Sequence, residues 1–155
     1  MKSEKINVLY VDDEVDNLNA FKAVYRRDFN VFIVESAAEG TKILENNEIE
    51  VILTDQRMPE MTGVEFLESI LDEFPESMRI LVTGYTDVGA VIDAINKGQV
   101  YRYVSKPWDN DDLRNIITQS AEVYRLRKEK RVLTEDLIRV QKQLEFMLRQ
   151  KLSSN

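Results

Sequence analysis

The sequence predicts an α/β fold in which a doubly wound, five-stranded and mostly parallel sheet carries helices on both faces. Short apolar runs recur along the first 121 residues, and amphipathic stretches separate them. Several runs are almost continuous in apolar and β-branched side chains, as in strands that are buried on both faces of a parallel sheet. The patterns of strand and helix alternate throughout this region, which is the order that builds parallel strands joined by crossover helices.

The strands are predicted from apolar runs of about five residues, a length typical of buried strands. They fall at residues 6–11, 31–34, 49–53, 79–83 and 100–104. Ser36 and Thr62 each stand three residues before a glutamate, which is the spacing of a capping box. These signals predict helices at about residues 37–46 and 63–74, and Gly98 predicts the end of a later helix.

The composition excludes several classes of chemistry. The chain has 155 residues, of which 43% are hydrophobic and 32% charged, as in an ordinary globular protein. It contains neither cysteine nor histidine. Disulfides, thiolate nucleophiles, Ser-His relays and imidazole metal sites are therefore excluded, and any chemistry depends on Asp, Glu, Lys, Thr, Ser or Tyr.

No apolar run approaches the ~20 residues of a membrane span, and the apolar stretch near the start is too short for a signal peptide. We therefore expect a cytoplasmic protein without a membrane partner.

The charge divides the chain into two parts. The net charge is −7, but residues 1–121 carry 12 basic and 23 acidic side chains, whereas residues 122–155 carry nine basic and five acidic ones. We expect an acidic globular domain at residues 1–121 and a basic helical extension at residues 122–155.

The extension has a seven-residue apolar register. Its d positions are Leu126, Leu133, Val140 and Met147, and its a positions are Val123, Lys130, Leu137, Leu144 and Lys151. This register predicts a dimeric coiled coil, and hence a homodimer, although lysines at two a positions weaken the seam. A helix that folds back on its own domain and a frayed chain end are the alternatives.

Polar residues follow the predicted strands at the edge where ligands of parallel α/β sheets bind. They are Asp12, Asp13 and Glu14 after the first strand, Asp55 after the third, Thr83 at the end of the fourth, and Ser105, Lys106 and Pro107 after the fifth. Clustered carboxylates repel one another, and a hard cation such as Mg²⁺ relieves the repulsion. One ionised Asp is then a nucleophile toward phosphorus, while an ammonium and a hydroxyl neutralise the phosphoryl oxygens.

Sequence blocks at these strand ends identify a family resemblance. VLYVDDE, LTDQRMPEMTGVEFL, RILVTGYTD and YVSKPWD occur in this order. Over about residues 5–121 the chain resembles the receiver domain of two-component response regulators, and four blocks in register make the match specific. The resemblance implies a flavodoxin-like fold with strand order 2-1-3-4-5.

The resemblance also implies roles for the residues of the cluster. Asp55 is the phosphorylated residue, and Asp12 and Asp13 hold Mg²⁺ or Mn²⁺ together with Asp55. The backbone carbonyl of Arg57 is a further metal ligand, and Lys106 pairs with the phosphoryl group.

By the same resemblance, Thr83 and Tyr103 are a switch pair, in which the hydroxyl moves to the phosphoryl group and the aromatic ring turns inward. Arg57 and Tyr85 flank the site where similar proteins tune the lifetime of the acyl phosphate, in a direction that the sequence leaves open. The expected partner is a sensor histidine kinase or a phosphotransfer protein. The chain is then a signalling module that catalyses only its own phosphorylation and dephosphorylation, with its output through the last helix.

Two other classes fit the residues less well. A phosphatase resembling the haloacid dehalogenase group has a second acid two residues after its nucleophile, where this chain has Arg57. A nucleic-acid arm at residues 122–155 is disfavoured because its basic residues are interleaved with acids and heptad leucines. We therefore expect no direct binding to nucleic acid.

Overall fold

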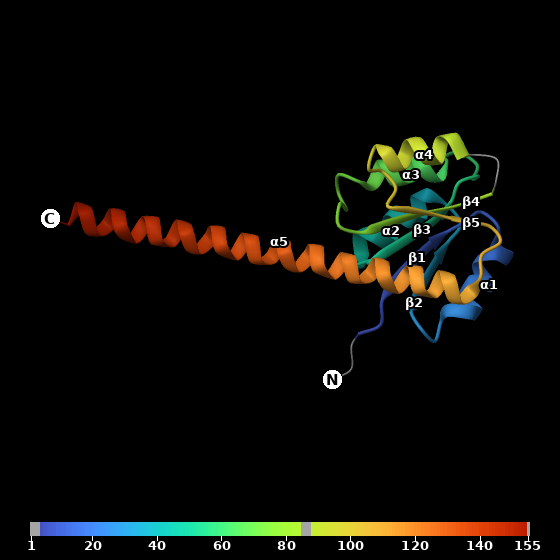
Figure 1. Ribbon diagram of the computed structural model, residues 1–155, viewed down its shortest axis with the longest axis horizontal. Helices are drawn as coiled ribbons and strands as arrows, with labels where there is room; N and C mark the ends of the chain where they lie inside the picture. Colours follow the sequence, from blue (N-terminus) through green and yellow to red (C-terminus); the bar gives the residue numbers. More distant parts are fainter. Residues whose placement is uncertain (1–3, 85–87, 155) are drawn as a thin grey trace. The chain divides into compact units, whose positions relative to one another are not determined.

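A computed structural model describes residues 4–84 and 88–154 (Figure 1). The chain divides into two compact units, residues 1–124 and residues 125–155. The division lies three residues beyond the boundary that the charge pattern predicts.

The first unit is built on a parallel sheet. In the part of the chain that the structure describes, its strands are β1 (Asn7–Val11), β2 (Asn30–Val34), β3 (Val51–Asp55), β4 (Met78–Thr83) and β5 (Arg102–Ser105). Their order is β2-β1-β3-β4-β5, and every neighbouring pair is parallel. This confirms the predicted flavodoxin-like topology.

Helices connect the strands and cover both faces of the sheet (Figure 1). They are α1 (Val15–Tyr25), α2 (Ala37–Asn46), α3 (Gly63–Ile70), α4 (Val88–Asn96) and α5 (Asn110–Ser153). α1 and the first turns of α5 pack on one face, and α2, α3 and α4 pack on the other. The extended C-terminal helix is confirmed as a continuous element.

The side chains of each strand alternate between two apolar layers. From β1, Val8 and Tyr10 enter the layer shared with α1 and α5, whereas Leu9 and Val11 enter the layer shared with α2, α3 and α4. All four are fully buried. Burial of a large apolar side chain contributes about 1.5–3 kcal/mol, so both layers stabilise the edge that carries the polar residues.

The helix starts follow the predicted caps. The Thr62 hydroxyl accepts from the Glu65 amide while the Glu65 carboxylate accepts from the Thr62 amide, which completes a capping box. Ser36 also accepts from the Glu39 amide, at 3.2 Å. Gly98 has a φ of 74°, a left-handed conformation that favours glycine just after a helix.

α3 ends earlier than expected, at Ile70 instead of residue 74. The Leu71 amide bonds back only three residues, to the carbonyl of Glu68, so the last turn tightens. Pro75 lies shortly beyond, and proline disfavours the helical conformation of the residue before it. The sequence pattern of apolar residues therefore continued past the true helix end.

The last helix spans both units of the chain. Leu113, Ile117 and Tyr124 are buried in the first unit, where the Tyr124 hydroxyl donates to Glu48 at 2.7 Å. From residue 125 to residue 154, nearly all side chains are exposed. Within residues 4–84 and 88–154, no helix combines the length and the apolar character needed to cross a membrane.

Candidate functional site

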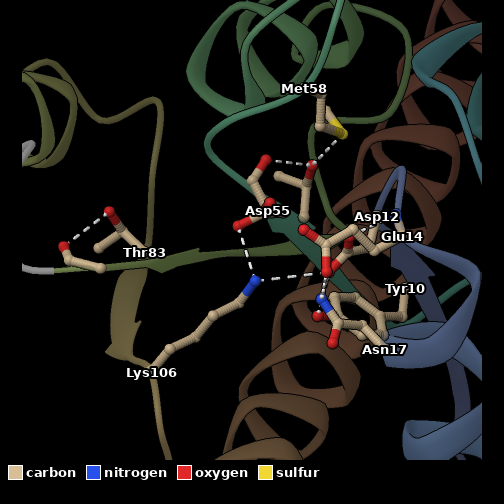
Figure 2. Close-up of polar contacts among 10 residues, drawn as sticks. Tyr10, Asp12, Glu14, Asn17, Asp55, Met58, Thr83 and Lys106 are labelled. Atoms are coloured by element: carbon tan, nitrogen blue, oxygen red, sulfur yellow. Dashed lines mark hydrogen bonds and ion pairs between the residues drawn. The ribbon is translucent and has the colours of Figure 1, made fainter.

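Three side chains from different strands meet at the carboxyl edge of the sheet (Figure 2). Asp12 follows β1, Asp55 is the last residue of β3, and Lys106 follows β5, in a cis peptide bond with Pro107. The Lys106 ammonium lies 3.1 Å from Oδ1 of Asp55 and 3.5 Å from Oδ2 of Asp12. The predicted convergence of carboxylates and ammonium therefore exists.

Asp12, Asp13 and Asp55 form a cluster suited to a cation. One carboxylate oxygen of each lies within 4.8 Å of the others. Asp12 is fully buried and Asp13 is exposed, so the cluster opens to solvent on one side. Oxygen ligands with an open side fit Mg²⁺, which usually retains water and binds phosphate oxygens as well.

The charges of the cluster are strongly coupled. Burial raises the pKa of Asp55 above its ordinary value, and the hydrogen bond and charge of Lys106 offset only part of this rise. Burial lowers the pKa of Lys106, but the contacts with Asp55 and Asp12 outweigh it and the pKa is raised. The lysine therefore stays protonated, and an added cation would favour the ionised form of Asp55.

Asp12 is held by groups that the sequence did not point to. Its Oδ2 accepts from the Tyr10 hydroxyl at 2.7 Å and from Nδ2 of Asn17 at 3.2 Å (Figure 2), and its Oδ1 accepts from the Glu14 amide at 2.9 Å. Burial and the Asp12 contact raise the pKa of Tyr10, so this phenol remains a donor. One sequence signal could have indicated this hydrogen bond. Tyr10 and Asp12 are two residues apart, and side chains at this spacing lie on the same side of an extended chain.

Gly63 brings α3 against the end of β3. Its amide donates to the Gln56 carbonyl at 3.0 Å, and the Gln56 side chain accepts from the Val64 amide at 3.0 Å. A Cβ at position 63 would lie 2.4 Å from the carbonyl oxygen of Asp55 and 2.8 Å from Cδ1 of Leu81. Only glycine allows this approach.

The family model described as the response regulator receiver domain matches residues 8–118. The chain belongs to the response regulator receiver family. Among curated proteins, this receiver is 38% identical over 122 residues to the hydrogenase transcriptional regulatory protein HoxA of Bradyrhizobium diazoefficiens. That match covers 79% of this chain and 25% of HoxA, so the chain spans about a quarter of the length of this relative.

Solved structures agree with this assignment. A receiver domain protein from Clostridium thermocellum is 30% identical, with a TM-score of 0.74 over 78% of this chain and 98% of that one. A structure described as an adenylate cyclase from Rhodopirellula baltica is 31% identical, with a TM-score of 0.81 over 84% and 98% of the two chains. Receiver domains bind Mg²⁺ through an acidic cluster, and Asp12, Asp13 and Asp55 form such a cluster here.

The expected switch residues of the receiver lie on β4, which neighbours the strand of Asp55, and on β5, the next strand along the sheet. Thr83 ends β4 and is buried, and its hydroxyl donates to the Gly84 carbonyl at 3.1 Å (Figure 2). Tyr103 lies on β5 with 48% of its surface exposed. About half of this residue is therefore open to solvent in this conformation.

The remaining predicted residue, Arg57, lies in the loop two residues after Asp55, with its side chain exposed. Tyr85, the second residue expected to flank the site, lies outside the described residues.

Proposed function

We propose that this receiver accepts a phosphoryl group on Asp55 from the phosphohistidine of a sensor kinase or phosphotransfer protein, in a reaction that needs Mg²⁺. The observation that carries the proposal is the ion pair between Lys106 and Asp55 inside a cluster of carboxylates. A lysine in this place neutralises both the ionised acceptor and an arriving phosphoryl group.

The reaction forms one bond and breaks one. An oxygen of Asp55 attacks phosphorus, the P–N bond to the donor imidazole breaks, and the electron pair stays with that imidazole. Asp12, Asp13, Asp55 and the carbonyl of Arg57 would hold Mg²⁺, which when bound would supply positive charge for the phosphoryl oxygens. The Lys106 ammonium neutralises charge on the phosphoryl oxygens, and the Thr83 hydroxyl donates a hydrogen bond to them. Later attack of water on phosphorus breaks the bond to the Asp55 oxygen, releases inorganic phosphate and returns the free carboxylate.

The conformational signal starts at Thr83. When its hydroxyl exchanges the Gly84 carbonyl for a phosphoryl oxygen, the end of β4 shifts and leaves space for the exposed Tyr103 ring to turn inward. The surface of α4, β5 and α5 then changes with the position of the Tyr103 ring. The size of this change in population depends on how strongly phosphorylation favours the inward conformation over the outward one.

The output includes dimerisation through the second unit. The heptad side chains Leu126, Leu133, Leu137, Val140, Leu144 and Met147 are each 47–68% exposed. A helix that leaves such a stripe exposed is stabilised by pairing with a second apolar stripe, and a second copy of this chain supplies one. Charged pairs within the helix, such as Arg131 with Glu135, occupy other positions of the heptad.

Phosphorylation is tested by incubating the protein with Mg²⁺ and a small acyl-phosphate donor and measuring its intact mass. We expect one phosphate on the wild type, none in EDTA and none on Asp55→Asn. The exposed carboxylate Asp72, changed to Asn, is the matched control and should leave labelling unchanged. Equal labelling of the Asp55→Asn variant would refute the assignment.

The name of HoxA describes a transcriptional regulator, but this chain spans only a quarter of that protein. We therefore propose for this chain only the receiver function, and not the transcriptional regulation that the name of HoxA describes. Salt-dependent binding of this chain to duplex DNA would show that the basic second unit has a further role.

A further inference from the structure

Tyr10 is a buried residue of the site that the phosphoryl transfer described above does not use. Its hydroxyl lies 2.7 Å from Oδ2 of Asp12. Asn17 and Lys106 approach the same oxygen at 3.2 and 3.5 Å. A hydroxyl that donates to a carboxylate at such a short distance forms one of the stronger protein hydrogen bonds.

Packing aims the Tyr10 hydroxyl at Asp12. The Tyr10 ring is fully buried, with its centroid 4.7 Å from that of Phe21 and 6.3 Å from that of Trp108, which it meets edge-on. These rings come from α1 and from the loop after β5, so both elements fix the ring of a β1 residue. The hydroxyl therefore has little freedom to lose when it binds the carboxylate.

The Tyr10 contact also affects the pairing of Lys106. The ammonium has two carboxylates within reach and lies closer to Asp55, at 3.1 Å, than to Asp12, at 3.5 Å. A fully buried carboxylate such as Asp12 needs donors, and without the phenol it would draw the ammonium toward itself. Because Tyr10 and Asn17 already donate to Asp12, the Lys106 ammonium can remain closer to Asp55.

We propose that Tyr10 is a positioning residue, whose hydroxyl fixes the Asp12 carboxylate for Mg²⁺ and keeps Lys106 paired with Asp55. The inference rests on the proposed function, since it assigns a task within the same site. Tyr10 acts through Asp12 and has no contact with the phosphoryl group in this scheme. Hydrogen-bond partners behind metal ligands typically contribute about 10- to 100-fold in metal affinity.

The test compares Tyr10→Phe with Tyr25→Phe. Tyr25 is equally buried, and its ring centroid lies 4.8 Å from that of Phe21. Its hydroxyl, however, donates to the Asn110 carbonyl at 2.8 Å and not to the carboxylates of the site. Mn²⁺ affinity is measured from the electron paramagnetic resonance signal of the free ion, and stability by urea unfolding. We expect about tenfold weaker Mn²⁺ binding for Tyr10→Phe and wild-type binding for Tyr25→Phe, with both variants less stable than wild type.

Equal Mn²⁺ affinities for the two variants would overturn the inference. If Tyr10→Phe does not fold, Asn17→Ala decides instead, because Asn17 donates to the same oxygen from the less buried α1 surface. It should weaken Mn²⁺ binding in the same direction, and wild-type affinity would contradict the proposal. Wild type that binds Mn²⁺ but takes no phosphate would refute the proposed function while leaving the role of Tyr10 intact.

Discussion

Asp55 illustrates how the position of one residue sets its chemistry. It ends β3, so its carboxylate leaves the sheet beside those of Asp12 and Asp13. Burial and the neighbouring charge of Asp12 oppose its ionisation, and Lys106 favours it. The result is a carboxylate, the proposed phosphoryl acceptor, whose charged form a bound cation would stabilise further.

Replacement of Asp55 by Asn should stabilise the metal-free protein at neutral pH. The pKa of Asp55 is raised in the folded protein, so the folded state binds this proton more tightly than the unfolded chain. Between the ordinary and the raised pKa, stability therefore falls as pH rises, and above the raised value the full cost remains. An asparagine does not ionise, so Asp55→Asn avoids the loss of folding stability that the ionised Asp55 carboxylate causes.

Urea unfolding in EDTA from pH 4 to pH 7 measures this effect. We expect the excess stability of Asp55→Asn over wild type to grow as pH rises. Mg²⁺ should then stabilise the wild type more than the variant, because a ligand of the folded state adds more stability the more tightly it binds, and the variant lacks one carboxylate ligand. A stability difference that is constant with pH would contradict this electrostatic account.

The sequence predicted the meeting of Asp12, Asp55 and Lys106, because parallel strands end at a common edge and each residue directly follows a strand. The contact of Tyr10 with Asp12 was not predictable in the same way. It depends on the rings of Phe21 and Trp108, which come from distant parts of the chain.

The elements follow local signals wherever local contacts decide their ends. The capping residues Ser36 and Thr62 set the starts of α2 and α3, and Gly98 closes the turn after α4. The end of α3 was predicted too late, since apolar periodicity continues through residues that form a turn before Pro75. The close approach of Gly63 to the Asp55 carbonyl is a tertiary contact. The local sequence shows only that Gly63 follows the capping residue Thr62, which does not predict this contact.

Alanine at two helical glycines should change stability in opposite directions. At Gly63, the new Cβ meets backbone 2.4 Å away, so we expect a loss of about 2 kcal/mol or more, as for overpacking of a core. At Gly89 in α4, a Cβ meets no heavy atom within 4 Å, and Ala should add up to about 1 kcal/mol through its helix propensity.

Urea unfolding measures the free energy of unfolding of Gly63→Ala and of Gly89→Ala relative to wild type. Each variant is the control for the other. Equal effects would mean that the approach of α3 to the Asp55 carbonyl does not constrain position 63.

At the scale of the whole molecule, charge and apolar surface are distributed between two units. The acidic first unit buries its apolar side chains in two layers, whereas the basic second unit exposes a row of them. The charge pattern of the sequence changes sign after residue 121, three residues before this division. The first unit reaches Tyr124, whose hydroxyl donates to Glu48.

The adjacent residues Leu137 and Ile138 test the dimer. Leu137 is at an a position and 68% exposed, while Ile138 is one position off the seam and 46% exposed. Leu137→Lys should shift the protein to monomer in sedimentation equilibrium, because it adds a third charged a position to the seam. Ile138→Lys should remain dimeric.

Monomeric wild type at high concentration, or equal weakening by the two substitutions, would contradict the heptad assignment. In either case the exposed side chains of the second unit would serve another partner.

Asp55 is the proposed phosphoryl acceptor of this receiver, and the proposal has a direct chemical test. It is tested most directly by treating the protein with Mg²⁺ and a small acyl-phosphate donor, reducing it with borohydride and sequencing the peptides by mass spectrometry. Reduction converts an aspartyl phosphate to homoserine. We expect homoserine at position 55 and intact aspartate at Asp12 and Asp13. Homoserine at either of those two positions, with Asp55 unchanged, would refute the assignment of Asp55.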